Sequence, residues 1–219
     1  MYILLTKWKY LPKEFLLNNI FLPQDVTLQD LLEPETFELL AYVCMQYGFS
    51  IDDVARLKPS MIINILSLLQ VEKYGFVQLG VDFYYFEKAQ NANKPIYFLE
   101  TVESQILMLV SMGEGYENEF VLYSLNDMEN TESGLEILLY EWKHGNSFFM
   151  DDLLISMKDE WPHIYQIMIT DRHDIWIPQI MEFIASEKVY FVIAGVLHMH
   201  GPDGLLQMLK DRGFTVEQL

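Results

Sequence analysis

The chain has 219 residues, 51% of them apolar, and 32 Asp and Glu against 14 Lys and Arg give a net charge of −18. This length suffices for one substantial hydrophobic core, and the apolar content excludes an intrinsically disordered chain. The acidic balance argues against nucleic acids and anionic membrane surfaces as partners, because phosphate groups are bound by clustered cations.

The single cysteine, Cys44, excludes an intramolecular disulfide and lies in an apolar helical pattern typical of a core thiol. No run approaches the ~20 apolar residues of a membrane helix, and the N-terminus lacks the pattern of a cleaved signal peptide. The sequence therefore predicts a cytoplasmic protein without a membrane segment. It leaves open whether the protein forms an oligomer.

Local signals predict many helices and a few strands. Tyr2 to Leu5 reads as a short strand, and Pro34 begins a helix that Gly48 closes. Ser50 is expected to cap a short helix with Asp53 at its third position. Further helices are expected at about 59–69, 80–91, 104–109, 116–128, 132–143, 147–159, 163–186 and 202–212, the last with Pro202 at its first position.

Three segments carry strand signals, near 95–99, 189–195 and 214–217. Segment 189–195 is a continuous apolar run rich in β-branched and aromatic residues, as in strands buried on both faces. The expected fold class is α/β and predominantly helical, with a small central sheet and a helical block over it. The absence of linkers and repeats predicts a single domain, 1–219, with 116–187 as a helical insertion that forms a lid.

Glu100 and His198 each follow a predicted buried strand, and ligands of open α/β sheets bind at such carboxyl ends. Neutral imidazole is a frequent metal ligand. Together the two residues could hold a cation or act as a general base, and the alternatives are a structural histidine and a helix-capping glutamate. Gly195 would permit a tight exit from the strand towards His198.

Three other residues are weaker candidates, each with a structural alternative. His200 follows His198 in the same loop, Asp82 is equally a helix N-cap, and Arg172 is equally part of a solvated helix face. The sequence contains no GxSxG, P-loop, HExxH, GxGxxG or EF-hand motif, which removes the reaction classes that depend on them.

Several motifs together resemble the TraB/GumN family, which is related to the Tiki-type metalloproteases and more distantly to the erythromycin-esterase and ChaN-like proteins. They are T-L-Q-D-L-L-E-P-E at 27–35, L-G-V-D at 79–82, P-I-Y-F-L-E-T-V-E-S-Q at 95–105, Y-E-W-K-H-G at 140–145, D-R-H-D-I-W at 171–176 and the terminal run at 194–216. The resemblance implies a metal-dependent hydrolase whose site combines two GxxH histidines, a strand-end glutamate and an arginine. On this chain it maps one GxxH to Gly195 and His198, the glutamate to Glu100 and the arginine to Arg172.

The chain departs from the family pattern in two places. His173 stands where the family usually has Asn, and no first GxxH occurs between Met1 and Thr27, as if the N-terminus were shortened. One hypothesis is a metal-dependent hydrolase of the peptidase kind that acts on a peptide or small molecule. It would use a divalent metal on His198 and Glu100, a further ligand from His200, Asp82 or a partner chain, and Arg172 to stabilise negative charge. The alternative is a non-catalytic member that binds a peptide or partner.

Overall fold

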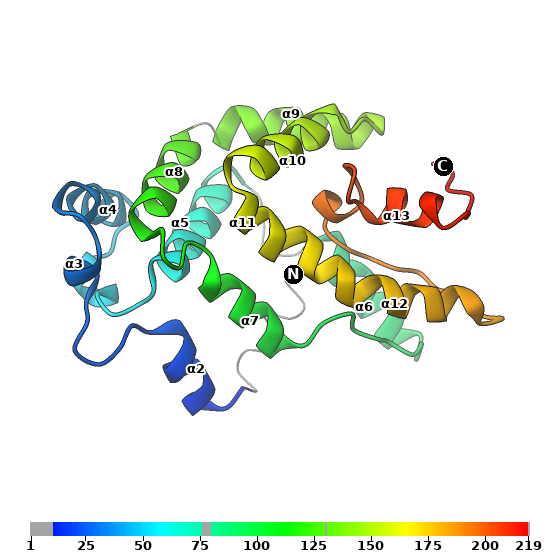
Figure 1. Ribbon diagram of the computed structural model, residues 1–219, viewed down its shortest axis with the longest axis horizontal. Helices are drawn as coiled ribbons and strands as arrows, with labels where there is room; N and C mark the ends of the chain where they lie inside the picture. Colours follow the sequence, from blue (N-terminus) through cyan, green and yellow to red (C-terminus); the bar gives the residue numbers. More distant parts are fainter. Residues whose placement is uncertain (1–10, 76–79, 130, 219) are drawn as a thin grey trace. The chain divides into compact units, whose positions relative to one another are not determined.

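The computed structural model describes residues 11–75, 80–129 and 131–218 (Figure 1). Contacts divide them into two compact units, which are treated separately below. Unit 1 contains residues 80–101 and 136–218, and unit 2 contains residues 11–75, 102–129 and 131–135. Helix α9 (Thr131–His144) begins in unit 2 and ends in unit 1.

Unit 2 is built from helices whose ends follow from local sequence signals. They are α2 (Lys13–Ile20), α3 (Leu28–Leu31), α4 (Pro34–Gln46), the 3₁₀ turn η2 (Ile51–Val54), α5 (Pro59–Lys73), α7 (Val102–Ser111) and α8 (Glu117–Glu129). Helix α5 packs against α7 and α8, and α4 packs against α8. Proline begins α4 and α5, and Ser50 caps η2 with Asp53 in a reciprocal capping box, which confirms these predictions.

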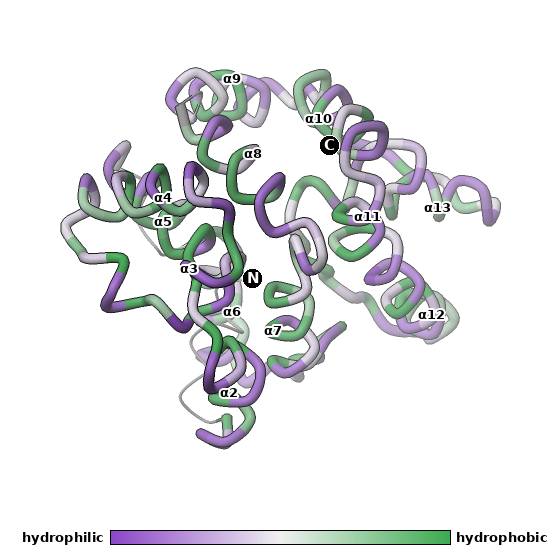
Figure 2. The backbone as a smooth tube through the Cα atoms, turned by 60° about the vertical axis from the view of Figure 1, so that its left-hand side comes forward, coloured by the Kyte–Doolittle hydropathy of each residue, from purple (hydrophilic) through white to green (hydrophobic). Residues whose placement is uncertain are grey.

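The core of unit 2 is apolar and tightly closed. Residues from five of its helices have no solvent exposure: Leu28, Leu40, Cys44, Ile62, Leu66, Ile106 and Val121. Cys44 is the core thiol that the sequence predicts, and its burial raises the pKa of the thiol to about 11. Figure 2 shows apolar and polar residues alternating along the helices, as expected where one side of each helix faces a core.

Unit 1 consists of helices joined by extended segments. They are α6 (Val81–Asn91), α10 (Phe148–Glu160), α11 (Pro162–Tyr165), the π turn η3 (Gln166–Thr170), α12 (Asp171–Ala185), the 3₁₀ turn η4 (Val196–His198) and α13 (Leu205–Asp211). Helices α11 and α12 continue in one line through the π turn (Figure 1). Pro178 lies inside α12 and does not divide it.

The predominantly helical character is confirmed, but the predicted central sheet is wrong. In the described ranges, no strand is present at 95–99, 189–195 or 214–217, and the one β-bridge joins Phe21 to Leu57. The apolar run after α12 is extended, yet Val189, Phe191 and Ile193 are exposed while the residues between them are half-buried. One side of the run packs and the other faces solvent, so its composition did not signal a strand covered on both faces.

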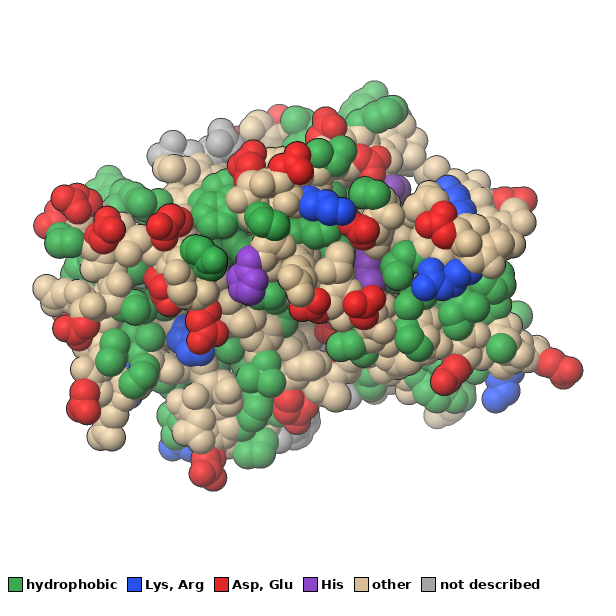
Figure 3. All heavy atoms as spheres, in the orientation of Figure 1, with side chains coloured by type: hydrophobic (Ala, Val, Ile, Leu, Met, Phe, Trp, Pro, Cys, Tyr) green, Lys and Arg blue, Asp and Glu red, His purple; other side chains and the backbone are tan. Residues whose placement is uncertain are grey.

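Two of the remaining expectations are not tested by the described residues. The strand expected at Tyr2–Leu5 lies outside the described residues, and the lid expected at 116–187 stays a prediction. Along the described chain, every helix is too short or too polar to traverse a lipid bilayer. Acidic side chains are spread over the face seen in Figure 3 and greatly exceed the basic ones there, in keeping with the net charge of −18.

Candidate functional site

Glu100, Arg172 and His198 meet in unit 1, although they are far apart in the sequence. Arg172 Nε donates to Glu100 Oε1 at 2.5 Å, and Arg172 Nη2 donates to Glu100 Oε2 at 3.2 Å. Arg172 Nη1 lies 2.8 Å from His198 Nε2. The arginine is thus held in a two-pronged ion pair on one side and against an imidazole on the other.

His173 extends this group into a directed chain of hydrogen bonds. Its Nε2 lies 3.0 Å from His198 Nδ1, and its Nδ1 lies 2.7 Å from the Asp203 carbonyl oxygen. Arg172 can only donate, so His198 Nε2 must accept, and His198 Nδ1 carries the proton and donates to His173 Nε2. His173 Nδ1 then donates to the carbonyl, and one tautomer of each neutral ring satisfies every contact. We call Glu100, Arg172, His173 and His198 the polar cluster.

Burial and charge hold both imidazoles of the polar cluster in their neutral form. His173 is 1% exposed and His198 is 7% exposed. Burial, followed by the positive charge of Arg172, lowers the pKa of His198 to about 3. Burial also lowers the pKa of His173, against the opposing effect of its hydrogen bond to Asp203. A proton added to either ring would place two donors face to face.

Trp176 packs against three members of the polar cluster from the next turn of α12. The Arg172 guanidinium lies 4.6 Å from the centre of the indole ring, within range of a cation–π contact. The His198 ring centre is also 4.6 Å away, and the His173 ring centre is 5.8 Å away. Trp176 Nε1 is buried and has no hydrogen-bond partner among the described residues. The indole therefore acts as a wall of the cluster.

Asp203 anchors its loop through both its backbone carbonyl and its side-chain carboxylate. Its carbonyl accepts from His173, while its carboxylate accepts from Tyr165 Oη at 2.8 Å and from Lys158 Nζ at 2.7 Å. The bond from Lys158 lowers the pKa of Asp203, and burial together with the Asp203 bond raises the pKa of Tyr165. Gly204 is required there, because a Cβ would lie 2.1 Å from the His200 carbonyl oxygen.

A π turn aims the start of α12 at the cluster. Residues Gln166–Thr170 form this wider turn directly before Asp171, and the backbone stays helical on both sides. Arg172 Nη1 also reaches the Met168 carbonyl within the turn, at 3.4 Å. Such turns add one residue to a helix and occur often at functional sites. Here it sets which side chains of α12 face Glu100 and His198.

The other candidates do not join the polar cluster. His200 is half-buried after η4, and the imidazole that contacts His198 belongs to His173. Asp82 lies in the first turn of α6, whose N-cap is Gly80, so the predicted capping role is wrong. Gly195 is the N-cap of η4 with a φ of −59°, and a Cβ there would meet only His198 Cδ2 at 3.7 Å. Neither backbone angle nor space demands glycine at this position.

Sequence reasoning missed four residues that complete the site: His173, Trp176, Asp203 and Tyr165. A signal existed for His173, because a second hydrogen-bonding ring stands where the resembled family usually has Asn. Trp176 follows Arg172 by four residues, a spacing at which helix side chains touch. No sequence pattern connects Tyr165 to Asp203, which are 38 residues apart.

The polar cluster as arranged does not suit a divalent metal ion. Both Glu100 oxygens and His198 Nε2 are directed at Arg172, so the guanidinium takes the place between them that a cation would take. In the described ranges, no three His, Cys, Asp or Glu side chains are arranged to hold a metal. A catalytic zinc site needs about three protein ligands and an open position. The residues present do not provide that set.

Comparison with known proteins places these residues in a family. The uncharacterized protein YbaP of Escherichia coli (strain K12) is 22% identical over 206 residues, covering 86% of this chain and 70% of that protein. YbaP of Shigella flexneri matches with the same identity and coverage. No solved structure matches the chain. The sequence model of the TraB/PrgY/gumN family matches residues 13–218, which confirms the resemblance. The chain belongs to the TraB/PrgY/gumN family.

Proposed function

We propose that this chain is a TraB/PrgY/gumN protein that binds a protein partner without catalysing a reaction. The observation that carries the proposal is the closed bonding of the polar cluster. Arg172 occupies the lone pairs of Glu100 and His198 that a metal would need, and His173 takes the remaining nitrogen proton. A saturated, buried network of this kind braces a fold, and its own side chains are not free to act as a nucleophile or base.

An exposed apolar surface of unit 1 supports the binding role. Segment 189–193 exposes Val189 fully, Phe191 to 71% and Ile193 to 37% on one side. The Phe191 ring lies 4.9 Å from Tyr85, and Tyr85 lies 5.2 Å from Tyr84, both on α6. We call these five residues the aromatic surface. Contiguous exposed apolar side chains are typical of protein interfaces, where Tyr and Phe are enriched.

Metal analysis of purified protein tests the non-catalytic part of the proposal. The wild type and His198→Ala are dialysed against zinc or manganese, then freed of loose metal and measured by mass spectrometry. We expect both proteins to hold negligible metal. About one ion per wild-type chain, lost in His198→Ala, would refute the proposal, because a ligand set would then exist around that ring.

Peptide display tests the binding part. Random peptides selected on the wild type are measured against Phe191→Ser and, as a matched control, Phe148→Ser. Phe148 is 73% exposed on α10 and lies outside the aromatic surface. We expect the selected peptides to lose affinity for Phe191→Ser alone. Selected peptides that bind both variants as well as the wild type would count against the aromatic surface.

A metal-dependent hydrolase is the second candidate, and one observation favours it. Three residues that the family resemblance assigns to a hydrolytic site converge although they are separated by 72 and 26 residues. For this function, Arg172 would have to release Glu100 and His198. The same metal analysis separates the two candidates, since bound metal in the wild type supports the hydrolase.

A further inference from the structure

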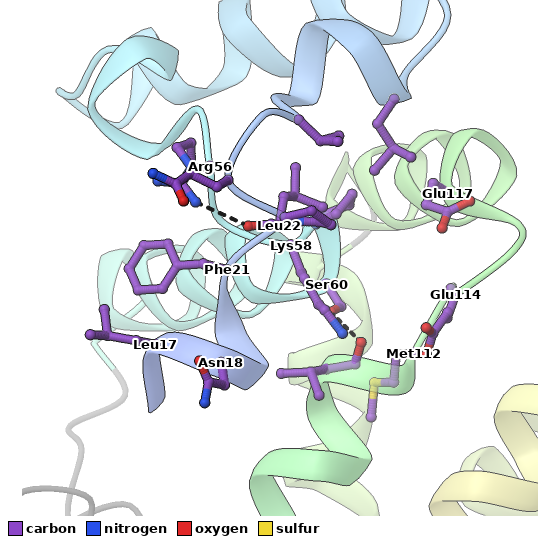
Figure 4. A pocket seen from close by; sticks show the side chains of 17 residues that line it. Leu17, Asn18, Phe21, Leu22, Arg56, Lys58, Ser60, Met112, Glu114 and Glu117 are labelled. Atoms are coloured by element: carbon purple, nitrogen blue, oxygen red, sulfur yellow. Dashed lines mark hydrogen bonds between the residues drawn. The ribbon is translucent and has the colours of Figure 1, made fainter. Parts of the chain in front are cut away.

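Unit 2 contains a pocket whose lining residues all belong to that unit. Its cavity volume is about 760 Å³, within the range of small-molecule sites. It is open to solvent and is lined by residues of α2, the loop after it, the segment before α5 and the loop between α7 and α8 (Figure 4). Leu17, Phe21, Leu22 and Val110 are among its apolar lining residues.

Backbone hydrogen bonds join the chain at the end of α2 to the segment before α5, which carries the basic residues of the pocket. Leu22 N donates to the Arg56 carbonyl at 2.7 Å, and Lys58 N donates to the Ile20 carbonyl at 3.0 Å. Arg56 Nη2 in turn donates to the Leu22 carbonyl at 3.2 Å. One of the five guanidinium donors is thus used to position the side chain.

Opposite charges line the two ends of this pocket. Figure 4 shows Arg56 at one end and Glu114 and Glu117 at the other. Lys58 also lines the pocket and is half-buried. Glu117 is positioned by the Gly115 amide, which donates to its Oε1 at 3.0 Å. Within the part of the chain that the structure describes, none of these four side chains forms an ion pair.

This arrangement is unusual on so acidic a chain. With a net charge of −18, a surface cation has many carboxylates to pair with, yet neither Arg56 nor Lys58 forms an ion pair with another described residue. Figure 4 shows Glu114 and Glu117 at the end opposite Arg56, so they do not neutralise its guanidinium, while Lys58 lies between the two ends. The cavity therefore presents a positive end and a negative end with apolar side chains between them.

We propose that the pocket binds an elongated zwitterion, a molecule with a carboxylate and an ammonium group at opposite ends of an apolar body. Arg56 binds the carboxylate, because its guanidinium offers a pair of parallel donors. Glu114 and Glu117 bind the ammonium group. The apolar body lies on Leu17, Phe21 and Val110. Both a linear ω-amino acid and a short peptide with free ends have this chemistry.

Calorimetric titrations with defined probes test the proposal. The probes are 8-aminooctanoate and trileucine, with octanoate and octylamine as analogues that each carry one of the two charges. We expect at least one zwitterion to bind the wild type more tightly than either analogue, and the better probe identifies the source of the ligand. Equal binding of the zwitterions and the analogues, or no binding of any probe, would overturn the proposal.

Charge-removing variants show whether the assigned ends are correct. Arg56→Gln should weaken the zwitterion and octanoate by about tenfold, the value of one charged hydrogen bond, and leave octylamine unchanged. Glu117→Gln should weaken binding of the zwitterion and of octylamine and leave the affinity for octanoate unchanged. Lys73→Gln, at the exposed end of α5 and outside the pocket, is the matched control and should bind like the wild type. An Arg56→Gln protein with unchanged octanoate affinity would contradict the assignment.

Discussion

Replacing Glu100 with Gln tests the idea that the polar cluster depends on a buried ion pair. The Glu100 side chain is 6% exposed and its partner Arg172 is 14% exposed. Glutamine keeps the shape and one acceptor oxygen, but it removes the negative charge and turns an NH₂ group towards the guanidinium. The variant therefore leaves a buried cation without a counter-charge.

The expected loss follows from that burial. Breaking a buried ion pair by removing one partner costs about 3–5 kcal/mol. Because glutamine retains an acceptor oxygen, we expect Glu100→Gln to lower the free energy of unfolding by about 3 kcal/mol, the lower end of that range. Urea unfolding at pH 7, followed by tryptophan fluorescence, measures it. Three of the four tryptophans, Trp142, Trp161 and Trp176, belong to unit 1, so the signal reports mainly on the unit that holds the cluster.

An exposed ion pair of the same unit supplies the control. Lys158 and Asp203 are 48% and 35% exposed, and pairs of this kind contribute about 0–1 kcal/mol. Lys158→Gln should thus be destabilised by less than about 1 kcal/mol in the same assay. The reasoning fails if Glu100→Gln loses no more stability than Lys158→Gln.

Three further predictions concern the histidine chain and the loop beside it. Folding lowers the pKa of His198 from its ordinary 6.5 to about 3. The unfolded chain therefore takes up the proton first as the pH falls, and stability should drop by about 2 kcal/mol between pH 7 and pH 5. In urea titrations His198→Asn should lack that part of the decline, and an equally steep decline in the variant would contradict the assignment. Gly204→Ala should lose more than about 2 kcal/mol because its Cβ has no room, while Gly195→Ala should change stability by no more than about 0.5 kcal/mol, and comparable losses would rule out the steric argument. Tyr165→Phe should lose about 1 kcal/mol with the bond to Asp203, which the same unfolding curves measure.

Local chemistry made most helices predictable. Pro34 and Pro59 begin helices because their fixed φ suits a first turn, and Ser50 with Asp53 satisfies the free amides of η2. Gly48 follows α4 with a φ of +86°, a backbone conformation that favours glycine. Signals of this kind act over a few residues, so a sequence displays them directly.

The sheet was not predictable for the opposite reason. A strand requires a neighbouring backbone, and neither 95–99 nor 189–195 encodes which segment will lie beside it. The run from Val189 to Ala194 has the composition of a buried strand, but only alternate residues pack. Composition records hydrophobicity and does not record which side is covered.

Family motifs predicted part of the candidate site. They pointed to Glu100, Arg172 and His198, which the structure brings together. They did not point to His173 as the ring that contacts His198, because neighbouring helix residues diverge by about 100° and either could have faced the cluster. The hydrogen-bond partners of Asp203 depend on packing between α10, α11 and the loop before α13, which no short motif describes.

The π turn Gln166–Thr170 has a consequence for how this segment tolerates insertions and deletions. Each residue of an α-helix advances the chain by about 100°, so losing one residue from the turn would convert it to an ordinary turn and rotate everything before it relative to α12. The helix would survive such a deletion, while α11 and α10 would swing away from the loop that Tyr165 and Lys158 hold. Related chains that lack this one residue should therefore keep the helix and lose the bonds from Tyr165 and Lys158 to Asp203.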